Sequence, residues 1–247
     1  MNRREIFMAL EIKKATEISR THNWRVLLYG KPGLGKTSAI KGLTGKVLVL
    51  DLDNSSRVLA GMDNVDIISF NRENPIQSMK EFLEEGKDII KDYQTLVIDN
   101  ITAFEKDWFV ARGLKSKNGI RNEIQDYGDY TNYFLRLITK LYSFPINVYV
   151  TAWESKRDVN LEDGTTLTEY IPDVRSQVIN QLLGLTDAVG RIQVNPVTHG
   201  RGAILEGSDG VYAKNRLDNR TACKIEDLFK FGQEVKQTKT KAEGEQK

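Results

Sequence analysis

Apolar runs and helical stripes alternate along the first 150 residues of the chain. Five short apolar or β-branched runs predict buried strands of a parallel sheet, at residues 24–29, 47–51, 65–70, 95–99 and 146–151. Apolar residues recur at helical spacing over 75–93, 103–111 and 127–142, which predicts helices between these strands. The alternation indicates an α/β fold with a mainly parallel central sheet and helices on both faces.

The last third of the chain predicts smaller pieces. These are a polar hairpin over 156–169 with its turn at 162–165, a helix over 174–185, and short strands at 189–194, 202–206 and 211–213. We therefore expect a C-terminal extension rich in β-hairpins. Residues 3–20 fit either a helix or a short strand followed by a helix. One domain over 1–232 accounts for these elements, and the polar residues 233–247 predict a disordered tail.

Composition narrows the class of protein. The chain has 247 residues, 40% hydrophobic and 28% charged, with a net charge of +2, as in an ordinary soluble domain. Polyanion binding would therefore have to come from local patches. Cys223 is the only cysteine, which excludes an internal disulfide, and with His22 and His199 it forms no recognisable zinc motif. No apolar run reaches membrane-spanning length, so we expect a cytoplasmic protein without a membrane partner.

Residues 30–37 carry the strongest chemical signal. They read Gly-Lys-Pro-Gly-Leu-Gly-Lys-Thr, fit the P-loop pattern G-x-x-x-x-G-K-[ST], and lie between a predicted strand and a helix start at 37–43. The glycines let successive N–H groups face phosphate oxygens, and the helix adds its positive end. The predicted nucleotide-binding residues are Gly30, Lys31, Pro32, Gly33, Leu34, Gly35, Lys36, Thr37 and Ser38.

The P-loop predicts ATP and Mg²⁺ as ligands. Lys36 is expected to reach the β- and γ-phosphates, and Thr37 to place its hydroxyl on Mg²⁺. The strand at 95–99 ends in Asp99, a Walker B pattern, so Asp99 is the second predicted metal residue. The alternatives are a glycine-rich turn without a ligand, and a strand-end Asp99 that caps the next helix.

The residue that activates water is a separate question. Asn100 follows Asp99, where many AAA+ proteins have a glutamate, and it cannot take a proton. Asp53 is the candidate base, because it ends the strand that follows the P-loop helix, two residues after Asp51, and points to the same side as Asp51. The alternative is that Asp53 caps the turn at 54–56.

At the end of the strand at 47–51 the chain resembles the RecA-like ATPases, whose second strand ends in Asp-x-Glu. Asp51-Leu52-Asp53 matches that position with the shorter acid. Four stretches are similar to the phage nucleotide-binding proteins: residues 27–38, Ile-Gln-Asp-Tyr-Gly at 124–128, Val-Thr-Ala-Trp-Glu at 150–154 and Ala-Lys-Asn-Arg at 213–216. Some members of that family are proposed single-strand annealing recombinases. The resemblance covers roughly residues 10 to 232.

The resemblance implies further site residues and a homo-oligomer, either ring or filament. Lys214 and Arg216 match a Lys-x-Arg pattern that reaches the γ-phosphate of the neighbouring subunit, and Thr151 occupies the place of a polar γ-phosphate sensor. Hydrolysis is then expected to be slow and stimulated by assembly or DNA, in the cytoplasm of a bacterial host. The alternative for Lys214 and Arg216 is a pair of solvated cations at a strand end.

The resemblance also implies binding of single-stranded DNA through loops. The candidate residues are Arg112, Lys115, Lys117 and Arg121 in a basic loop, and Lys156 and Arg157 at the root of the predicted hairpin. The alternative is that these cations are solvated surface charges. No aromatic stacking platform accompanies either the basic loop or the hairpin, which weakens the case for DNA binding.

Three functions remain open from the sequence. The first is an ATP-dependent recombination or annealing protein that acts on single-stranded DNA, with a phage single-strand-binding or replication protein as a further partner. The second is an ATP-dependent assembly switch or loader for a replication or packaging partner. The third is a small-molecule kinase, against which the sequence shows no arginine-rich lid.

Overall fold

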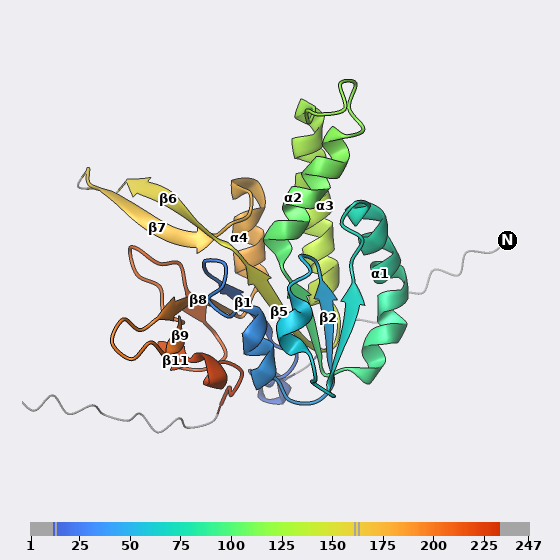
Figure 1. Ribbon diagram of the computed structural model, residues 1–247. Coiled ribbons are helices and arrows are strands. Elements are labelled where there is room, and N and C mark those ends of the chain that lie inside the picture. The colour runs from blue at the N-terminus through green and yellow to red at the C-terminus, as the bar shows by residue number, and fades with distance from the viewer. Residues whose placement is uncertain (1–11, 13, 161, 163, 233–247) are drawn as a thin grey trace, which may run out of the picture.

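The computed structural model describes residues 12, 14–160, 162 and 164–232 (Figure 1). The predicted tail at 233–247 and most of the undecided segment at 3–20 lie outside these residues. Of that segment, only a short 3-10 helix, η1 (Ala15–Glu17), is a described element.

A central sheet of nine strands organises the described residues. Its order is β11-β9-β8-β1-β5-β4-β2-β3, with β10 also paired to β8. The six strands from β8 to β3 are mutually parallel, and β9, β10 and β11 are antiparallel to their neighbours. The strands are β1 (Arg25–Tyr29), β2 (Val47–Asp51), β3 (Val65–Ser69), β4 (Thr95–Asp99), β5 (Asn147–Ala152), β8 (Ala188–Val194), β9 (Arg201–Ile204), β10 (Lys214–Asn215) and β11 (Ala222–Lys224).

Helices cover the two faces of this sheet unequally. The α-helices α1 (Pro75–Ile89), α2 (Ile101–Gly113), α3 (Ile124–Tyr142) and α4 (Ser176–Leu185) share one apolar core with one set of alternate strand residues, such as Leu27 and Leu50. The other set, such as Leu28 and Val49, packs against the short 3-10 helices η2 (Thr37–Gly42), η3 (Ser56–Leu59) and η5 (Ile225–Asp227). A further 3-10 turn, η4 (Ile90–Asp92), continues α1.

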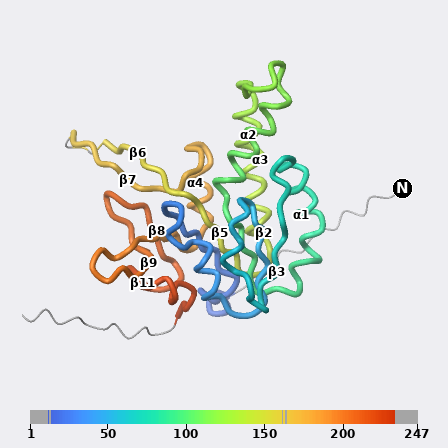
Figure 2. Tube along the Cα trace, viewed as in Figure 1, coloured from blue at the N-terminus to red at the C-terminus, as the bar shows by residue number. Residues whose placement is uncertain are grey.

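Two projections leave the carboxyl edge of the parallel strands (Figure 2). The first is the arm formed by α2, the loop at 114–123 and the upper part of α3, drawn in green. The second is the hairpin of β6 (Glu154–Asn160) and β7 (Thr166–Pro172), drawn in yellow, whose strands pair only with each other. Both begin where a central strand ends: α2 follows β4, and β6 follows β5.

The predicted fold class is confirmed, with changes at several elements. The helix expected after the P-loop is the 3-10 helix η2, at whose start the Ala39 N–H is shared between the carbonyls of Gly35 and Lys36, at 3.0 and 3.2 Å. The strand predicted at 211–213 is wrong: Val211 forms only isolated bridges, to Tyr170 and Ser208, and pairing with β8 begins at Lys214.

The loop predicted at 112–121 also begins later than expected. Helix α2 continues through Arg112 to Gly113, and α3 begins at Ile124, ahead of the expected 127. The early start follows from a reciprocal cap, in which the Asp126 carboxylate accepts the Glu123 N–H at 2.9 Å.

Candidate functional site

The P-loop lines a cleft of about 460 Å³ at the carboxyl edge of the parallel strands. Its walls come from the loop itself and from residues that follow three other strands: Asp53 and Ser55 after β2, Asp99 and Asn100 at the end of β4, and Trp153 after β5. Crevices at the carboxyl ends of parallel strands are where α/β proteins place their ligands. Side chains distant in sequence are therefore brought together as the motifs predicted.

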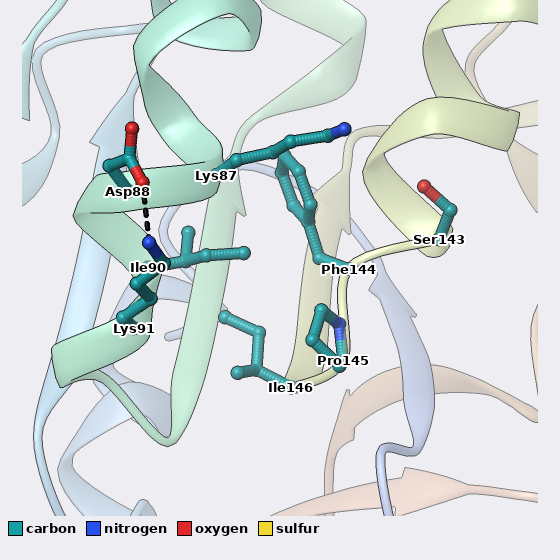
Figure 3. Close-up of a pocket in the computed structure, with 8 residues that line it drawn as sticks. All are labelled: Lys87, Asp88, Ile90, Lys91, Ser143, Phe144, Pro145 and Ile146. Carbon is teal, nitrogen blue, oxygen red and sulfur yellow. Dashed lines mark hydrogen bonds and ion pairs between the residues drawn. The ribbon is translucent and has the colours of Figure 1, made fainter. Parts of the chain in front are cut away.

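A second cleft, of about 500 Å³, lies at the opposite edge of the sheet (Figure 3). Half of its lining residues are apolar, among them Ile90, Phe144 and Ile146, and the others are polar or charged, among them Lys87 and Lys91. None of the predicted site residues lines it. We therefore place the candidate chemistry in the cleft at the P-loop.

The P-loop glycines occupy positions that a side chain would disturb. Gly33 and Gly35 have φ angles of +80° and +98°, in the region that favours glycine. At Gly30 a Cβ atom would lie 2.4 Å from Cγ2 of Ile192. The loop can therefore curl tightly against β8, as a phosphate-binding loop requires.

Lys36 is held inside the loop. Its side chain is buried, with 6% of the residue exposed, and its Nζ donates to the carbonyls of Gly30 at 2.9 Å and Lys31 at 3.0 Å. Burial lowers the pKa of Lys36, while the carboxylates of Asp99 and Asp53 act in the opposite direction. The ammonium thus lies where phosphate oxygens of a bound nucleotide would approach the loop.

Thr37 and Asp99 meet at the bottom of the cleft. The Thr37 hydroxyl donates to Oδ2 of Asp99 at 2.6 Å, the Ser55 hydroxyl donates to the same oxygen at 3.1 Å, and the Thr151 hydroxyl donates to Oδ1. Burial raises the pKa of Asp99, and these hydroxyl donors oppose that shift. A carboxylate beside a threonine hydroxyl is a donor set of the kind that Mg²⁺ uses together with nucleotide phosphates. The residues therefore fit a magnesium ion.

Neither alternative role considered for Asp99 and Asp53 agrees with the hydrogen bonds. Helix α2 is capped by Asn100, whose Oδ1 accepts the Ala103 N–H at 2.8 Å. The turn after β2 is capped by Asp51, which accepts the N–H groups of Ser55 and Ser56 at 3.0 and 3.2 Å. Neither Asp99 nor Asp53 therefore caps a helix or a turn.

Asp53 lies in the same cleft and is oriented by Asn100. The Asn100 Nδ2 donates to Oδ2 of Asp53 at 2.8 Å. The other oxygen, Oδ1, is buried and has no hydrogen-bond partner within the described residues. Asp53 is thus fixed through one oxygen, while the other is buried beside the cleft without a partner among the described residues.

Lys214 and Arg216 are far from the P-loop of their own chain. Lys214 pairs with Val189 near the start of β8, whereas the P-loop follows the carboxyl end of β1. The Lys214 ammonium donates to the Leu183 carbonyl, and Nη1 of Arg216 donates to the Gly184 carbonyl at 3.2 Å. Arg216 is otherwise exposed. The fold does not bring these two residues to the site of the same subunit.

The cations predicted to touch DNA differ in their surroundings. Arg112 lies in α2 rather than in the predicted loop, and Asp126 and Asp129 hold its guanidinium at 2.6 and 3.0 Å. That correction leaves Lys115, Lys117 and Arg121, all exposed around the tip of the arm.

The two cations of the hairpin are engaged with neighbouring side chains. Arg157 forms an ion pair with Glu169 at 2.6 Å, and the Lys156 ammonium lies 5.1 Å from the centre of the Tyr170 ring. Both residues remain exposed at the surface, so these contacts position the cations without burying them.

Two polar residues of the cleft, Ser55 and Arg201, were not predicted from the sequence. Ser55 contacts both Thr37 and Asp99, at 3.2 and 3.1 Å, because the turn that Asp51 caps carries it over the P-loop. Arg201, at the start of β9, lines the cleft from the far side. No motif spacing points to Arg201, since its position depends on how β8 and β9 pair.

Comparison with known proteins gives a family match and a structural likeness. A family model described as AAA domain matches residues 22–217. A KaiC-like protein from the hyperthermophilic archaeon Pyrococcus horikoshii OT3 is 18% identical, with a TM-score of 0.42, over 74% of this chain and 79% of that chain. None of the curated proteins matches the sequence. Within the described residues, no helix is both long and apolar enough to cross a membrane.

Proposed function

The chain belongs to the AAA domain family, and on that premise we propose that it hydrolyses ATP and acts on single-stranded DNA in recombination or annealing. The observation that carries the ATPase proposal is the convergence of Lys36, Thr37, Asp99 and Asp53 on one cleft. The four residues come from three strand ends: Lys36 and Thr37 follow β1, Asp53 follows β2, and Asp99 ends β4. Each has the chemistry that one part of phosphoryl transfer requires.

Each residue of the cleft has a distinct proposed part in binding. The P-loop N–H groups and Lys36 would hold the phosphates, while Thr37 and Asp99 would hold Mg²⁺, with Asp99 acting through water. The ion would neutralise the charge that develops on the transferred phosphoryl group. Thr151 and Ser55 fix the Asp99 carboxylate through their hydroxyl groups. The position of Thr151 does not support the sensor role that the resemblance implies, because the residue is fully buried and does not line the cleft.

Asp53 is the proposed acceptor of the proton of the attacking water. Its side chain is shorter than the glutamate of the RecA-like pattern, so its reach toward the γ-phosphate is smaller. Slow hydrolysis in the isolated subunit is the expected consequence. Lys214 and Arg216 would complete the site from a neighbouring subunit, because they lie away from the P-loop of their own chain. A homo-oligomer, ring or filament, is therefore part of the proposal.

The proposed DNA contacts lie on the two projections. Lys115, Lys117 and Arg121 at the tip of the arm are the main candidates, with Lys156 and Arg157 on the hairpin. Both projections start at strand ends that also supply residues to the P-loop cleft: Asp99 precedes α2, and Trp153 precedes β6. This shared origin supports a link between nucleotide state and DNA binding.

The test is an ATPase assay with and without single-stranded DNA, paired with binding titrations at several salt concentrations. We expect DNA to stimulate hydrolysis in the wild-type protein. The Lys36→Ala variant should show no hydrolysis with or without DNA. Replacing Lys115, Lys117 and Arg121 together by alanine is expected to lower the salt slope of DNA binding by about 2, from about 0.7 for each phosphate contact. The matched control replaces the exposed residues Lys80, Lys87 and Arg136. Equal stimulation in both triple variants would contradict the assignment of the arm.

A second candidate function is favoured by the apolar surface of the arm. Ile120 and Ile124 are 81% and 92% exposed, and Val110 and Leu114 are also exposed. Exposed apolar groups of this kind mark protein-binding surfaces. They favour an ATP-dependent assembly switch or loader that docks on a phage replication or packaging partner. ATP turnover unaffected by DNA but raised by such a partner would support this function over the first.

A further inference from the structure

Arg201 lies over the P-loop of its own chain. It is the first residue of β9 and lines the same cleft as Asp53 and Asp99. A Cβ atom at Gly35 would lie 2.7 Å from Nη1 of Arg201 and 3.4 Å from its Cζ. The guanidinium therefore packs directly on the backbone of Gly35.

Strand pairing explains how this arginine reaches the loop. β8 runs beside β1 with Arg191 opposite Tyr29, and it continues past the end of β1 to Val194. β9 returns antiparallel to it, so that Arg201 is opposite Val194. The edge of the sheet thus extends beyond the P-loop strand and comes to lie beside the loop.

The alternation of side chains along β9 sets the direction of Arg201. Residues two apart on a strand point to the same face. Ala203 is buried in the core that contains Ala39 and Ile40 of η2, the helix that follows the P-loop. Arg201 accordingly faces the side of the sheet that carries this helix.

Opposite charges reach the cleft from the two sides of β1. Asp53 and Asp99 follow β2 and β4 on one side of β1 in the sheet, and Arg201 begins β9 on the other side of β1. Within the described residues, the Arg201 guanidinium has no hydrogen bond or ion pair to a protein group. Its donors are available at the surface, whereas the Lys36 ammonium already contacts two carbonyls. A guanidinium presents a planar fork of N–H groups that matches phosphate oxygens.

We propose that Arg201 binds the phosphate chain of the nucleotide in cis. The proposal rests on ATP binding by the P-loop as proposed above, and it adds a residue from the same subunit that is separate from Arg216. Arg201 would contact the phosphates from the side opposite the metal residues. Because the contact is to phosphate, its contribution should be the same for any base.

The test measures binding of ATP, GTP and inorganic tripolyphosphate to the full chain by calorimetry, with Mg²⁺ present. Arg201→Ala is expected to weaken all three by about tenfold or more, the usual range for a lost charge-assisted contact. Arg201→Lys should recover part of the loss. Arg136→Ala, an exposed arginine on α3, should bind as the wild type does. The melting temperature without ligand should be the same for all of them.

The outcomes separate this inference from the proposed function. A wild-type protein that binds neither ATP nor tripolyphosphate would remove the proposed function itself. If the wild type binds but Arg201→Ala binds equally well, the inference about Arg201 is overturned and the proposed function stands. If Arg201→Ala loses affinity for ATP but not for tripolyphosphate, the contact is to base or ribose, and the phosphate assignment is wrong.

Discussion

The amide of Asn100 donates to Asp53 at 2.8 Å, and this contact orients the carboxylate in the cleft. The amide cannot turn over freely, because its oxygen accepts the Ala103 N–H at the start of α2. One side chain thus both caps a helix and positions the candidate base. The residue that the sequence excludes as a base is the one that holds the base in place.

Replacing Asp53 by asparagine should separate binding from hydrolysis. The variant keeps the size of the side chain but cannot accept a proton, so ATP affinity should stay within about twofold while turnover falls by about 100-fold or more. Fluorescence titration and single-turnover hydrolysis measure the two quantities. Asp63→Asn, which changes an exposed carboxylate, is the control. Turnover that survives in Asp53→Asn would place the base elsewhere.

Asp99→Asn should make the protein more stable without Mg²⁺. Burial raises the pKa of Asp99, so the folded state binds its proton more tightly than the unfolded state. Ionisation then costs stability as pH rises from about 4 through the raised pKa. At neutral pH the neutral asparagine should add about 1 kcal/mol, or about 2–4 °C in melting temperature.

The same variant has a pH signature. Its advantage in melting temperature should shrink as the pH falls through the raised pKa, because the wild-type carboxyl is then neutral as well. It should also lose the extra stability that Mg²⁺ and ATP together give the wild type. A lower melting temperature for Asp99→Asn than for the wild type in chelator at pH 7 would show that the ionised carboxylate stabilises the fold.

Mixing two inactive variants tests the role of Arg216 in trans. Arg216→Ala keeps a sound P-loop, and Lys36→Ala keeps a sound arginine, so some mixed interfaces contain both groups. An equal mixture with random assembly should restore about a quarter of the wild-type interfaces. ATPase rates across mixing ratios measure this, with native mass spectrometry to establish that mixed oligomers form. Mixed oligomers without any recovery would argue for a role within one subunit.

Lys214 should impose a pH limit on assembly-dependent hydrolysis. Burial lowers its pKa to about 8, Arg216 acts in the same direction, and Asp187 opposes them. If the ammonium acts across the interface, the rate should fall as pH rises through about 8, and Lys214→Arg should lack that fall because arginine stays charged.

Loss of stability would not account for such a fall in rate. Between pH 8 and about 10.4 the unfolded chain binds more protons at Lys214 than the folded chain, so this group makes stability rise with pH. A thermal melt at each pH therefore separates the two effects. A rate that is flat across pH 8 in the wild type would contradict a charged role for Lys214.

Local motifs made much of the site predictable. The P-loop is contiguous, so its glycines, Lys36 and Thr37 follow from one pattern, and the rule that parallel strands share a carboxyl edge joins Asp99 and Asp53 to them. Arg201 could not be found in this way, because the register between β8 and β9 is fixed by packing rather than by spacing. The ion pairs of Arg112 were hidden for a similar reason, since the partners Asp126 and Asp129 lie on the next helix.

The distribution of helices was the least predictable part of the fold. The central strands are apolar on both faces, as in β2, where every residue is buried. Such strands contain no signal for the face on which a following helix packs. Helices do pack on both faces, as predicted, but among the described residues the four α-helices lie together on one face and the helices on the other face are short 3-10 helices.

This unequal covering has a consequence for how the molecule opens. The face beside the P-loop is closed by η2, η3 and η5, of six, four and three residues, whereas α1 and α3 have 15 and 19 residues. Short 3-10 helices have few and poorly aligned hydrogen bonds. Amide hydrogens on that face should therefore exchange with deuterium sooner than those of α1 and α3. The nucleotide side of the sheet would then be the separate, weaker cooperative unit, able to rearrange while the α-helical side stays folded.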